Sequence, residues 1–376
     1  MNNAISVYFH IPFCVKKCEY CNFCSFPAVS DETVEAYKNA LIAQLKAFGD
    51  EYGTKNVSTV YFGGGTPTYM TEKQLCEILN SAAKTFKLSS DSEITVEANP
   101  KTVNGKQLKI LKENGFNRLS LGLQSSNDEM SAFLGRIGTT ADFTETFFSA
   151  RKAGFSNIST DLIFALPHLS PLSSQEILAS DLDFIEKLGA EHISIYALSI
   201  EDGTPLARKQ NSLVFPNDDE QTEMYRFICS RLCKMGYEHY EISNFAKPGY
   251  RSRHNTGYWT RREYVGFGIA SHSFFENRRF SVKSDLHEYI KNAHSLPYSL
   301  SASTASNDVL TEAEAEEERV MLGLRLSDGI VYAVPEKEKY IKMLVAEGYA
   351  IRNGNKLSLT EKGFFVSNTI IGGLLK

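Results

Sequence analysis

The sequence predicts an α/β fold in which parallel strands alternate with covering helices and form a partial, TIM-like barrel. Three observations support this prediction. Runs rich in β-branched and aromatic residues alternate with amphipathic segments up to residue 198, which is the pattern of parallel βα units. Six such units can be counted, whereas a complete barrel has eight. Polar residues follow the strands at their carboxyl ends, where parallel sheets bind ligands.

Each element of the barrel can be placed from local signals. The strands are predicted at residues 5–11, 57–62, 93–97, 119–123, 158–164 and 192–198. The first helix is predicted over residues 31–48 because Asp31 is a helix-start residue, and Thr71 opens the second helix. The third helix is expected to end near Gly115, and a later helix covers residues 174–188. Beyond residue 198 the alternation fades.

The last part of the chain is predicted to be a separate small domain. Residues 296–310 are rich in small polar side chains and are predicted to link a barrel domain at 1–295 to a tail domain at 311–376. The predicted elements of the tail are helices at residues 311–326 and 340–347 and a hairpin at residues 349–359. This combination predicts a winged-helix-like fold. Its first helix is acidic, so DNA binding is not expected.

The composition excludes several classes of function. The chain has 376 residues and a formal net charge of -5, with Lys and Arg spread among Asp and Glu, so a nucleic-acid partner is not expected. No apolar run approaches the ~18 residues of a membrane span, and the first residues lack the pattern of a signal peptide. Seven cysteines, three of them close together, fit reduced thiols better than a disulfide framework. We therefore expect a cytoplasmic protein without a transmembrane segment.

Three cysteines near the N-terminus point to a metal centre. Cys14, Cys18 and Cys21 form a C-x3-C-x2-C pattern directly after the first predicted strand. A 4Fe-4S cluster normally takes four thiolates, so three close cysteines leave one iron free for an exchangeable ligand. A structural zinc ion with His10 or Cys24 as its fourth ligand, in a protein that serves only for interaction, is the alternative. The cysteine pattern alone leaves both interpretations open.

A glycine-rich turn follows the second predicted strand. Residues 63–67 are Gly-Gly-Gly-Thr-Pro, and glycines at a strand end let backbone amides approach a polar ligand closely. Together with the cysteine pattern one βα unit earlier, this turn resembles the radical S-adenosylmethionine (SAM) superfamily. The resemblance implies a 4Fe-4S cluster on Cys14, Cys18 and Cys21, and it implies that the Gly-Gly-Thr-Pro segment holds the amino group of SAM.

Further motifs narrow this resemblance. They are residues 8–14 (YFHIPFC), 61–68 (YFGGGTPT), 97–100 (EANP), 120–125 (SLGLQS) and 161–163 (DLI). With these motifs the chain resembles the oxygen-independent coproporphyrinogen III oxidases and their relatives, the HemW haem chaperones, over nearly its whole length. The resemblance implies that SAM contacts Tyr8, Gly64, Gly65, Thr66, Glu97, Gln124, Arg136 and Asp161. Glu97 and Asp161 suit the ribose hydroxyls, and Arg136 suits the carboxylate of SAM.

Two features favour the chaperones over the oxidases within this family. The oxidases carry a further cysteine two positions after the third cluster cysteine, where this chain has Phe23, and the neighbouring Cys24 is expected to be a small buried side chain. The stretch HNTGYW, which begins at His254, resembles the H-N-x-x-Y-W motif of HemW proteins. It is predicted to lie in a loop of the haem-motif region at 250–275, and it makes His254 the candidate haem ligand. His272 is a second candidate.

The leading prediction is a haem chaperone that binds a 4Fe-4S cluster, SAM and haem and passes haem to acceptor proteins. The alternative is an enzyme similar to coproporphyrinogen III oxidase, which decarboxylates a tetrapyrrole by radical oxidation, so enzymatic activity is left open. The expected partners are haem, a haem-accepting protein and, if the protein is redox active, an electron donor such as a flavodoxin or ferredoxin. Contact with a membrane is expected only peripherally, through an acceptor.

Overall fold

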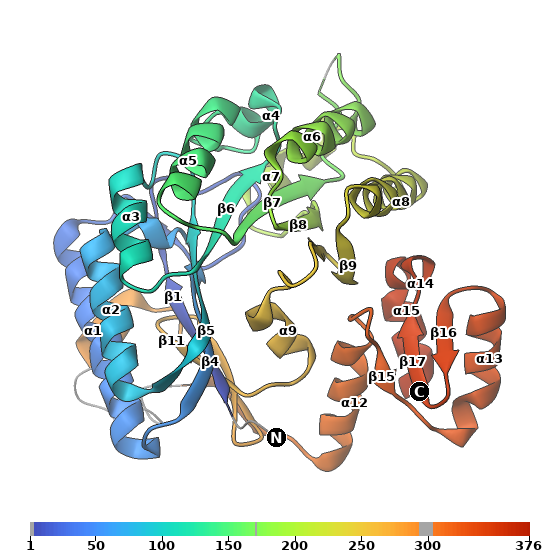
Figure 1. Cartoon of the computed structure of the whole chain (residues 1–376). Coiled ribbons are helices and arrows are strands. Elements are labelled where there is room, and N and C mark those ends of the chain that lie inside the picture. The colour runs from blue at the N-terminus through green and yellow to red at the C-terminus, as the bar shows by residue number, and fades with distance from the viewer. Residues whose placement is uncertain (1–3, 170, 293–303) are drawn as a thin grey trace. The chain divides into compact units, whose positions relative to one another are not determined.

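A computed structural model describes residues 4–169, 171–292 and 304–376 of the chain. Contacts in space between residues divide the chain into two compact units. Figure 1 labels their elements and colours them in chain order. The first unit consists of Met1–Leu162, Ser199–Leu213 and Arg262–Val309. The second unit consists of Ile163–Leu198, Val214–Arg261 and Leu310–Lys376.

Parallel strands form the centre of the first unit. Their order is β11 (Tyr264–Phe267), β1 (Ile5–Ile11), β4 (Asn56–Gly64), β5 (Lys87–Ala98), β6 (Arg118–Gln124) and β7 (Ile158–Phe164), whose last two residues belong to the second unit. Three antiparallel strands continue the sheet beyond β11, namely β12 (His272–Phe275), β13 (Arg278–Val282) and β14 (Thr304–Val309). Because the central strands are parallel, their carboxyl ends meet at one edge of the sheet.

The two faces of these parallel strands differ in polarity. One row of cross-strand partners consists of Tyr8, Tyr61, Thr95 and Arg118. The adjacent row consists of Phe9, Phe62, Val96 and Leu119. Successive side chains of a strand point to opposite faces, so the sheet has a polar inner face and an apolar outer face. A polar inner face can bind a polar ligand, whereas the apolar face requires a cover.

Helices provide that cover (Figure 1). They are α1 (Asp31–Tyr52), α2 (Glu72–Thr85), α3 (Gly105–Glu113) and α5 (Thr140–Lys152). Phe48 of α1 packs edge-on against Phe267 of β11, with ring centroids 5.9 Å apart, and Phe62 of β4 lies 5.2 Å from the Phe116 ring. The shorter elements of this unit are β2 (Phe13–Cys14), β3 (Phe26–Pro27), α4 (Asp128–Phe133), α7 (Pro205–Lys209) and α10 (Leu286–Asn292).

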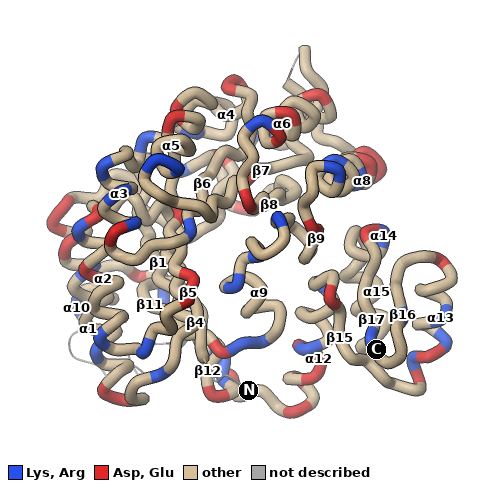
Figure 2. Tube along the Cα trace, in the orientation of Figure 1, with Lys and Arg blue, Asp and Glu red and all other residues tan. Residues whose placement is uncertain are grey.

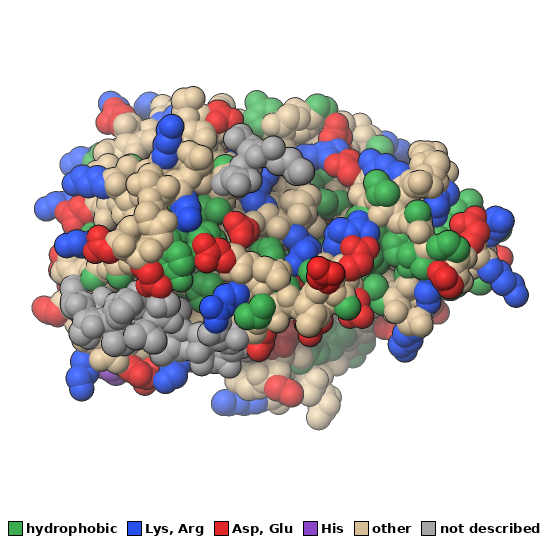
Figure 3. Space-filling view, turned by 90° about the horizontal axis from the view of Figure 1, so that it is seen from below, with side chains coloured by type: hydrophobic (Ala, Val, Ile, Leu, Met, Phe, Trp, Pro, Cys, Tyr) green, Lys and Arg blue, Asp and Glu red, His purple; other side chains and the backbone are tan. Residues whose placement is uncertain are grey.

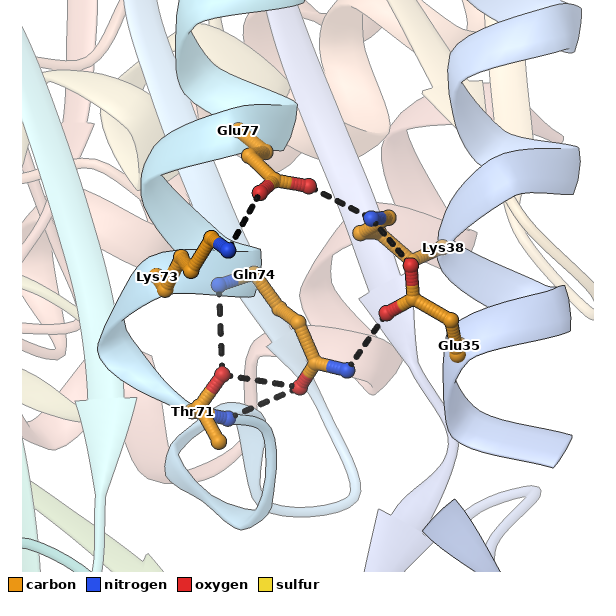
Figure 4. A network of polar contacts seen from close by, with 6 residues as sticks. All are labelled: Glu35, Lys38, Thr71, Lys73, Gln74 and Glu77. Carbon is orange, nitrogen blue, oxygen red and sulfur yellow. Dashed lines mark hydrogen bonds and ion pairs between the residues drawn. The ribbon is translucent and has the colours of Figure 1, made fainter. Parts of the chain in front are cut away.

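A buried lysine joins α1 to α2 (Figure 4). Lys38 is only 6% exposed, and its Nζ lies 2.6 Å from Glu35 Oε1 and 2.5 Å from Glu77 Oε2. Gln74 donates a hydrogen bond of 2.9 Å to the other oxygen of Glu35, and the Thr71 side chain caps the start of α2. The charge buried at this helix junction is therefore fully paired.

Charges elsewhere are mixed in sign. Basic and acidic residues are mixed along the chain (Figure 2), and on the face shown in Figure 3 their side chains lie interspersed. This distribution agrees with the small net charge of -5. Among the residues that the structure describes, no helix has both the length and the apolar character needed to cross a bilayer.

The second unit contains three antiparallel strands and the C-terminal tail. These strands are β8 (His192–Ala197), β10 (Asn244–Ala246) and β9 (Glu238–Glu241), which follow β7 in the same sheet, and the helices of this part are α6 (Ser174–Leu188), α8 (Asp218–Lys234) and α9 (Arg253–Trp259). The tail consists of α12 (Glu312–Gly323), α13 (Glu338–Ala346), α14 (Glu361–Phe365), α15 (Ser367–Leu375) and the strands β15 (Ile330–Val331), β17 (Lys356–Leu359) and β16 (Ala350–Asn353). Phe364 of the tail packs against the His239 ring at 5.1 Å, and Glu318 pairs with Arg261 at 2.8 Å. The tail thus packs against the rest of this unit.

The predicted fold class is confirmed, and two local predictions need correction. β1, β7 and α6 begin and end at the predicted residues. The segment around His254 is a helix, α9, and not the predicted loop, because the Ser252 side chain accepts a hydrogen bond from the Asn255 amide and caps its start.

The predicted linker also differs from what is observed. Residues 296–303 lie outside the described part of the chain, but Thr304–Val309 forms β14, which pairs with β13. The edge of β13 offers backbone groups for pairing, and small polar residues can pair with them because strand pairing uses backbone atoms. The domain boundaries at residues 1–295 and 311–376 stay a prediction.

Candidate functional site

The three predicted cluster cysteines lie on one segment of the first unit. Cys14 ends β2, and Cys18 and Cys21 follow before β3, all three as free thiols. Thr66 Oγ1 lies 3.6 Å from Cys14 Sγ, and Arg136 Nη1 lies 3.7 Å from Cys18 Sγ. Burial raises the pKa of Cys14 and of Cys21. Without a metal these two groups are neutral thiols, and a metal that binds them has to displace their protons.

The glycine-rich turn holds this segment against the end of β4. The amide of Gly65 donates to the Ile11 carbonyl at 2.8 Å, and the amide of Thr66 donates to the Phe13 carbonyl at 2.7 Å. A Cβ on Gly65 would lie only 2.7 Å from that Phe13 oxygen. The sequence predicts that backbone amides of this turn approach a ligand, but the amides of Gly65 and Thr66 bind the chain itself. Glycine is required here because two backbone segments approach each other closely.

His10 fills the space beside the same turn. Its Nε2 lies 2.9 Å from the Cys24 carbonyl oxygen and its Nδ1 lies 3.2 Å from the Tyr8 hydroxyl. Gly64 has a φ of +113° and passes so close to the ring that a Cβ would lie 2.6 Å from His10 Cε1. Both ring nitrogens of His10 therefore have protein partners. This arrangement fits a structural role of His10 in the turn.

Four side chains and a glycine converge at the carboxyl ends of β5 and β6. Arg136 Nη2 donates to Asn99 Oδ1 at 2.5 Å and to the Gly122 carbonyl at 2.8 Å, and Asn99 Nδ2 donates to Thr66 Oγ1 at 2.9 Å. A Cβ on Gly122 would lie 2.9 Å from Arg136 Nη2 and 3.1 Å from Gln124 Nε2. Gln124 itself has a φ of +70°, which is unusual for a residue with a side chain. Such strain is typical of functional sites.

Two carboxylates lie on the inner face below this cluster. The Tyr61 hydroxyl donates to Glu97 Oε1 at 2.7 Å, and the Ser120 hydroxyl lies 3.2 and 3.3 Å from the two oxygens of Asp161. Burial raises the pKa of Glu97 to about 7, and the charge of Asp161 adds to this rise. The Tyr61 hydroxyl, the Gly64 amide and the positive charge of Arg118 oppose it. Glu97 therefore changes its charge close to neutral pH.

His254 belongs to the second unit. It lies in the first turn of α9, is only 1% exposed, and its Nε2 lies 2.8 Å from the Tyr258 hydroxyl, with the two rings at right angles. Trp259 ends the same helix, and the Arg325 guanidinium lies 5.9 Å from its ring centroid. His272, the second candidate, begins β12 in the first unit and is exposed.

Comparison with known proteins identifies the family. The radical SAM superfamily model matches residues 8–179. The Heme chaperone HemW of Lactococcus lactis subsp. lactis (strain IL1403) is 32% identical over 377 residues, which cover 97% of this chain and 96% of the relative. The Heme chaperone HemW of Bacillus subtilis (strain 168) is 34% identical over 386 residues, covering 98% and 99%. The chain belongs to the HemW family of radical SAM proteins.

A solved structure shows the same fold. Coproporphyrinogen III oxidase (HemN) from Escherichia coli, described as a radical SAM enzyme, matches with a TM-score of 0.81 and 22% identity, covering 99% of this chain and 90% of the oxidase. At this identity the match establishes the fold and not the activity. It agrees with the partial barrel predicted from the alternation of strands and helices.

The structure brings the predicted residues of this HemW-family chain into one unit, with one exception. The three cysteines and the predicted SAM residues all lie in the first unit: the cysteines are on β2 and in the segment before β3, Arg136 follows α4, and the others are on or next to β1, β4, β5, β6 and β7. The exception is His254 in the second unit. In the described ranges, no three His, Cys, Asp or Glu side chains are grouped so as to hold a single metal ion.

Sequence reasoning missed three residues that shape the site. Asn99 and Gly122 lie within the quoted motifs, but the motifs did not show that Asn99 links Thr66 to Arg136 or that Gly122 leaves room for them. Arg118 had no motif signal at all. The available signal was the alternation of β6, which places Arg118 on the same face as Ser120.

Proposed function

We propose that this protein is a haem chaperone that binds a 4Fe-4S cluster, SAM and haem and passes haem to an acceptor protein. The observation that carries the proposal is the full-length similarity to proteins named Heme chaperone HemW. The grouping of thiols, carboxylates and Arg136 on one edge and inner face of the first unit supports it.

The cysteine segment fits a cluster with three protein ligands. Cys14, Cys18 and Cys21 would hold it, and when bound it supplies one-electron chemistry and an iron with an exchangeable ligand. Thr66 and Arg136 would donate hydrogen bonds to the sulfurs of Cys14 and Cys18, as they adjoin them already. Such hydrogen bonds stabilise the charge on thiolates and tune the reduction potential.

The inner face fits SAM. Arg136, which is held in place by Asn99 and the Gly122 carbonyl, would bind the SAM carboxylate, as guanidinium groups bind carboxylates with two parallel hydrogen bonds. Glu97 and Asp161 would accept hydrogen bonds from the ribose hydroxyls. We propose the remaining contacts at residues that border the same edge, namely Tyr8, Gly64, Gly65, Thr66 and Gln124.

His254 is the proposed haem ligand. Its Nε2 is hydrogen-bonded to the Tyr258 hydroxyl, so binding haem through this nitrogen has to break a bond worth about 1 kcal/mol net. A bond between the imidazole and the haem iron would offset that cost. A change at α9 is therefore expected when haem binds.

A titration tests this proposal against the oxidase alternative. Anaerobically reconstituted protein is mixed with haem and, separately, with coproporphyrinogen III, SAM and a reductant. We expect a Soret band at stoichiometric haem, and we expect that His254→Ala shifts or removes this band. His272→Ala tests the second candidate, and His287→Ala serves as the control, because His287 is also exposed and is not a candidate ligand. Formation of a decarboxylated tetrapyrrole, or an unchanged haem spectrum in His254→Ala, would overturn the respective part of the proposal.

A further inference from the structure

Arg118 is a buried cation on the inner face of the first unit. It begins β6, and its residue surface is only 2% exposed. Its Nε is fully buried and has no hydrogen-bond partner among the described residues. Burying a guanidinium with one of its donors unpartnered is costly. A side chain kept at such a cost is expected to act on neighbouring charges.

The neighbouring charges are the carboxylates of the site. Arg118 is the cross-strand partner of Thr95, and Glu97, two residues further along β5, faces the same side and is the partner of Ser120. Asp161 of β7 is the partner of Gly122, two residues beyond Ser120, and receives the Ser120 hydroxyl. Arg118, Glu97 and Asp161 thus share the inner face of three adjacent strands.

We propose that Arg118 is a positioning residue that keeps the Glu97 carboxylate ionised and thereby sets the affinity of the site for the ribose diol of SAM. The inference rests on the proposed function, because it takes the ribose as the ligand of Glu97. Arg118 acts through charge across the inner face, not through contact with the ligand.

The direction of the effect follows from the charges around Glu97. Two effects raise the pKa of Glu97. They are the burial of its own carboxyl group and the negative charge of Asp161 on β7. Three groups lower it, namely the Tyr61 hydroxyl and the Gly64 amide from β4 and Arg118 from β6. An ionised carboxylate accepts hydrogen bonds from both ribose hydroxyls, whereas a protonated one has less acceptor capacity. Affinity should therefore rise with pH as Glu97 ionises near pH 7.

The test is the pH profile of SAM binding to the anaerobically reconstituted protein between about pH 6 and 8.5, measured by calorimetry. Arg118→Met should move the midpoint up by about one pH unit and weaken binding about fivefold at pH 7. Arg118→Lys keeps the charge and should follow the wild type. Thr95→Val is the matched control, because the Thr95 hydroxyl has no hydrogen-bond partner in the described part of the chain.

Two outcomes would overturn the inference. One is an Arg118→Met profile with the wild-type midpoint and affinity. The other is a loss of affinity that is equal at every pH and is shared by Arg118→Lys, which would indicate a purely structural role.

A ligand-free measurement separates this inference from the proposed function. The infrared band of the protonated Glu97 carboxyl, identified by its absence in Glu97→Gln, should titrate near pH 7 in the wild type and at higher pH in Arg118→Met. If the wild type binds no SAM but the band behaves in this way, the SAM proposal fails and the electrostatic role of Arg118 stands. If the band does not move, the role of Arg118 fails.

Discussion

The outer helical layer and the inner face of the first unit each contain a buried cation, and the two cations differ in their hydrogen-bond partners. Lys38, between α1 and α2, is bound by the carboxylates of Glu35 and Glu77 at 2.6 and 2.5 Å. Burial alone would lower its pKa, but these hydrogen bonds raise it above the usual value. Arg118 on the inner face leaves its Nε without a partner among the described residues. In this pair, the cation that joins two helices is paired with carboxylates, whereas the cation beside the site keeps one donor atom without a partner among the described residues.

The largest difference between the inner face and the outer layer is expected for substitutions of their cysteines. Cys14 borders the inner face, whereas Cys76 is buried in α2 of the outer layer. We expect Cys14→Ser, and likewise the serine variants of Cys18 and Cys21, to lose the iron and sulfide found after anaerobic reconstitution. Cys76→Ala should keep both, because buried thiols outside a site pack as small apolar groups.

A variant of Cys24 tests whether the cluster has a fourth protein ligand. It lies three residues beyond Cys21, and burial raises the pKa of its thiol. We expect full iron and sulfide content in Cys24→Ser. Loss of the metal in this variant would show a fourth protein ligand and would contradict the three-cysteine cluster.

Two glycines with positive φ form a second matched pair. Gly53, at the C-terminal cap of α1, has a φ of +69°, and a Cβ added there would meet no described atom within 4 Å, whereas a Cβ on Gly64 would lie 2.6 Å from His10. Both alanine variants carry backbone strain of about 1 kcal/mol. Gly64→Ala adds a steric clash, so we expect it to lower the free energy of unfolding by about 3 kcal/mol. Denaturant titration measures both, and equal losses would contradict the close packing at Gly64.

The two buried cations form the third pair. Lys38→Met leaves Glu35 and Glu77 facing each other, and because both are partly exposed we expect a loss of about 2 kcal/mol in the free energy of unfolding. Arg118→Met removes a buried charge that lacks a full set of partners, so its stability should equal or exceed that of the wild type. Chemical denaturation at pH 7 distinguishes them. A larger loss in Arg118→Met than in Lys38→Met would refute the comparison.

The pH dependence of stability also separates the inner face from the outer layer. The pKa of Glu97 in the folded protein is raised to about 7 from 4.5, so the folded state binds more protons and stability falls as pH rises through this window. Glu97→Gln should remove this fall, which linkage sets at roughly 1 kcal/mol for each pH unit between about pH 5 and 7. For Glu35, hydrogen bonds from Gln74 and Lys38 lower the pKa. Its contribution has the opposite sign and is lost only as pH falls below about 4.5.

The regular part of the fold could be predicted from the sequence. β1, β7 and α6 match their predicted bounds because each is a continuous periodic run with clear end signals. After residue 198 the strands are short and, apart from β11, antiparallel, such as β9 with four residues and β10 with three. Strands of that length carry too little alternation to be recognised, and β14 formed where the composition indicated a linker.

The candidate site could be predicted only in part. Motifs named the cysteines, the glycine turn and most side chains of the inner edge, because these positions carry distinctive residue types at fixed spacing. They did not show that the Gly65 and Thr66 amides bind the Ile11 and Phe13 carbonyls. Nor did they show that the His254 imidazole is bonded to Tyr258 inside a helix. Hydrogen-bond partners depend on which segments meet, and spacing along the chain does not encode this.

The sequence by itself determined the alternation of strands and helices, the polar and apolar rows of each strand, and the three cysteines with the glycine turn. Only the tertiary structure decided which buried charges are paired. Lys38 meets Glu77 because α1 packs beside α2, although the two residues are distant along the chain. Arg118 shares a face with Glu97 and Asp161 because the register of three strands places it there. The free energy of a buried charge depends on its distance from other charges in space, and folding sets that distance.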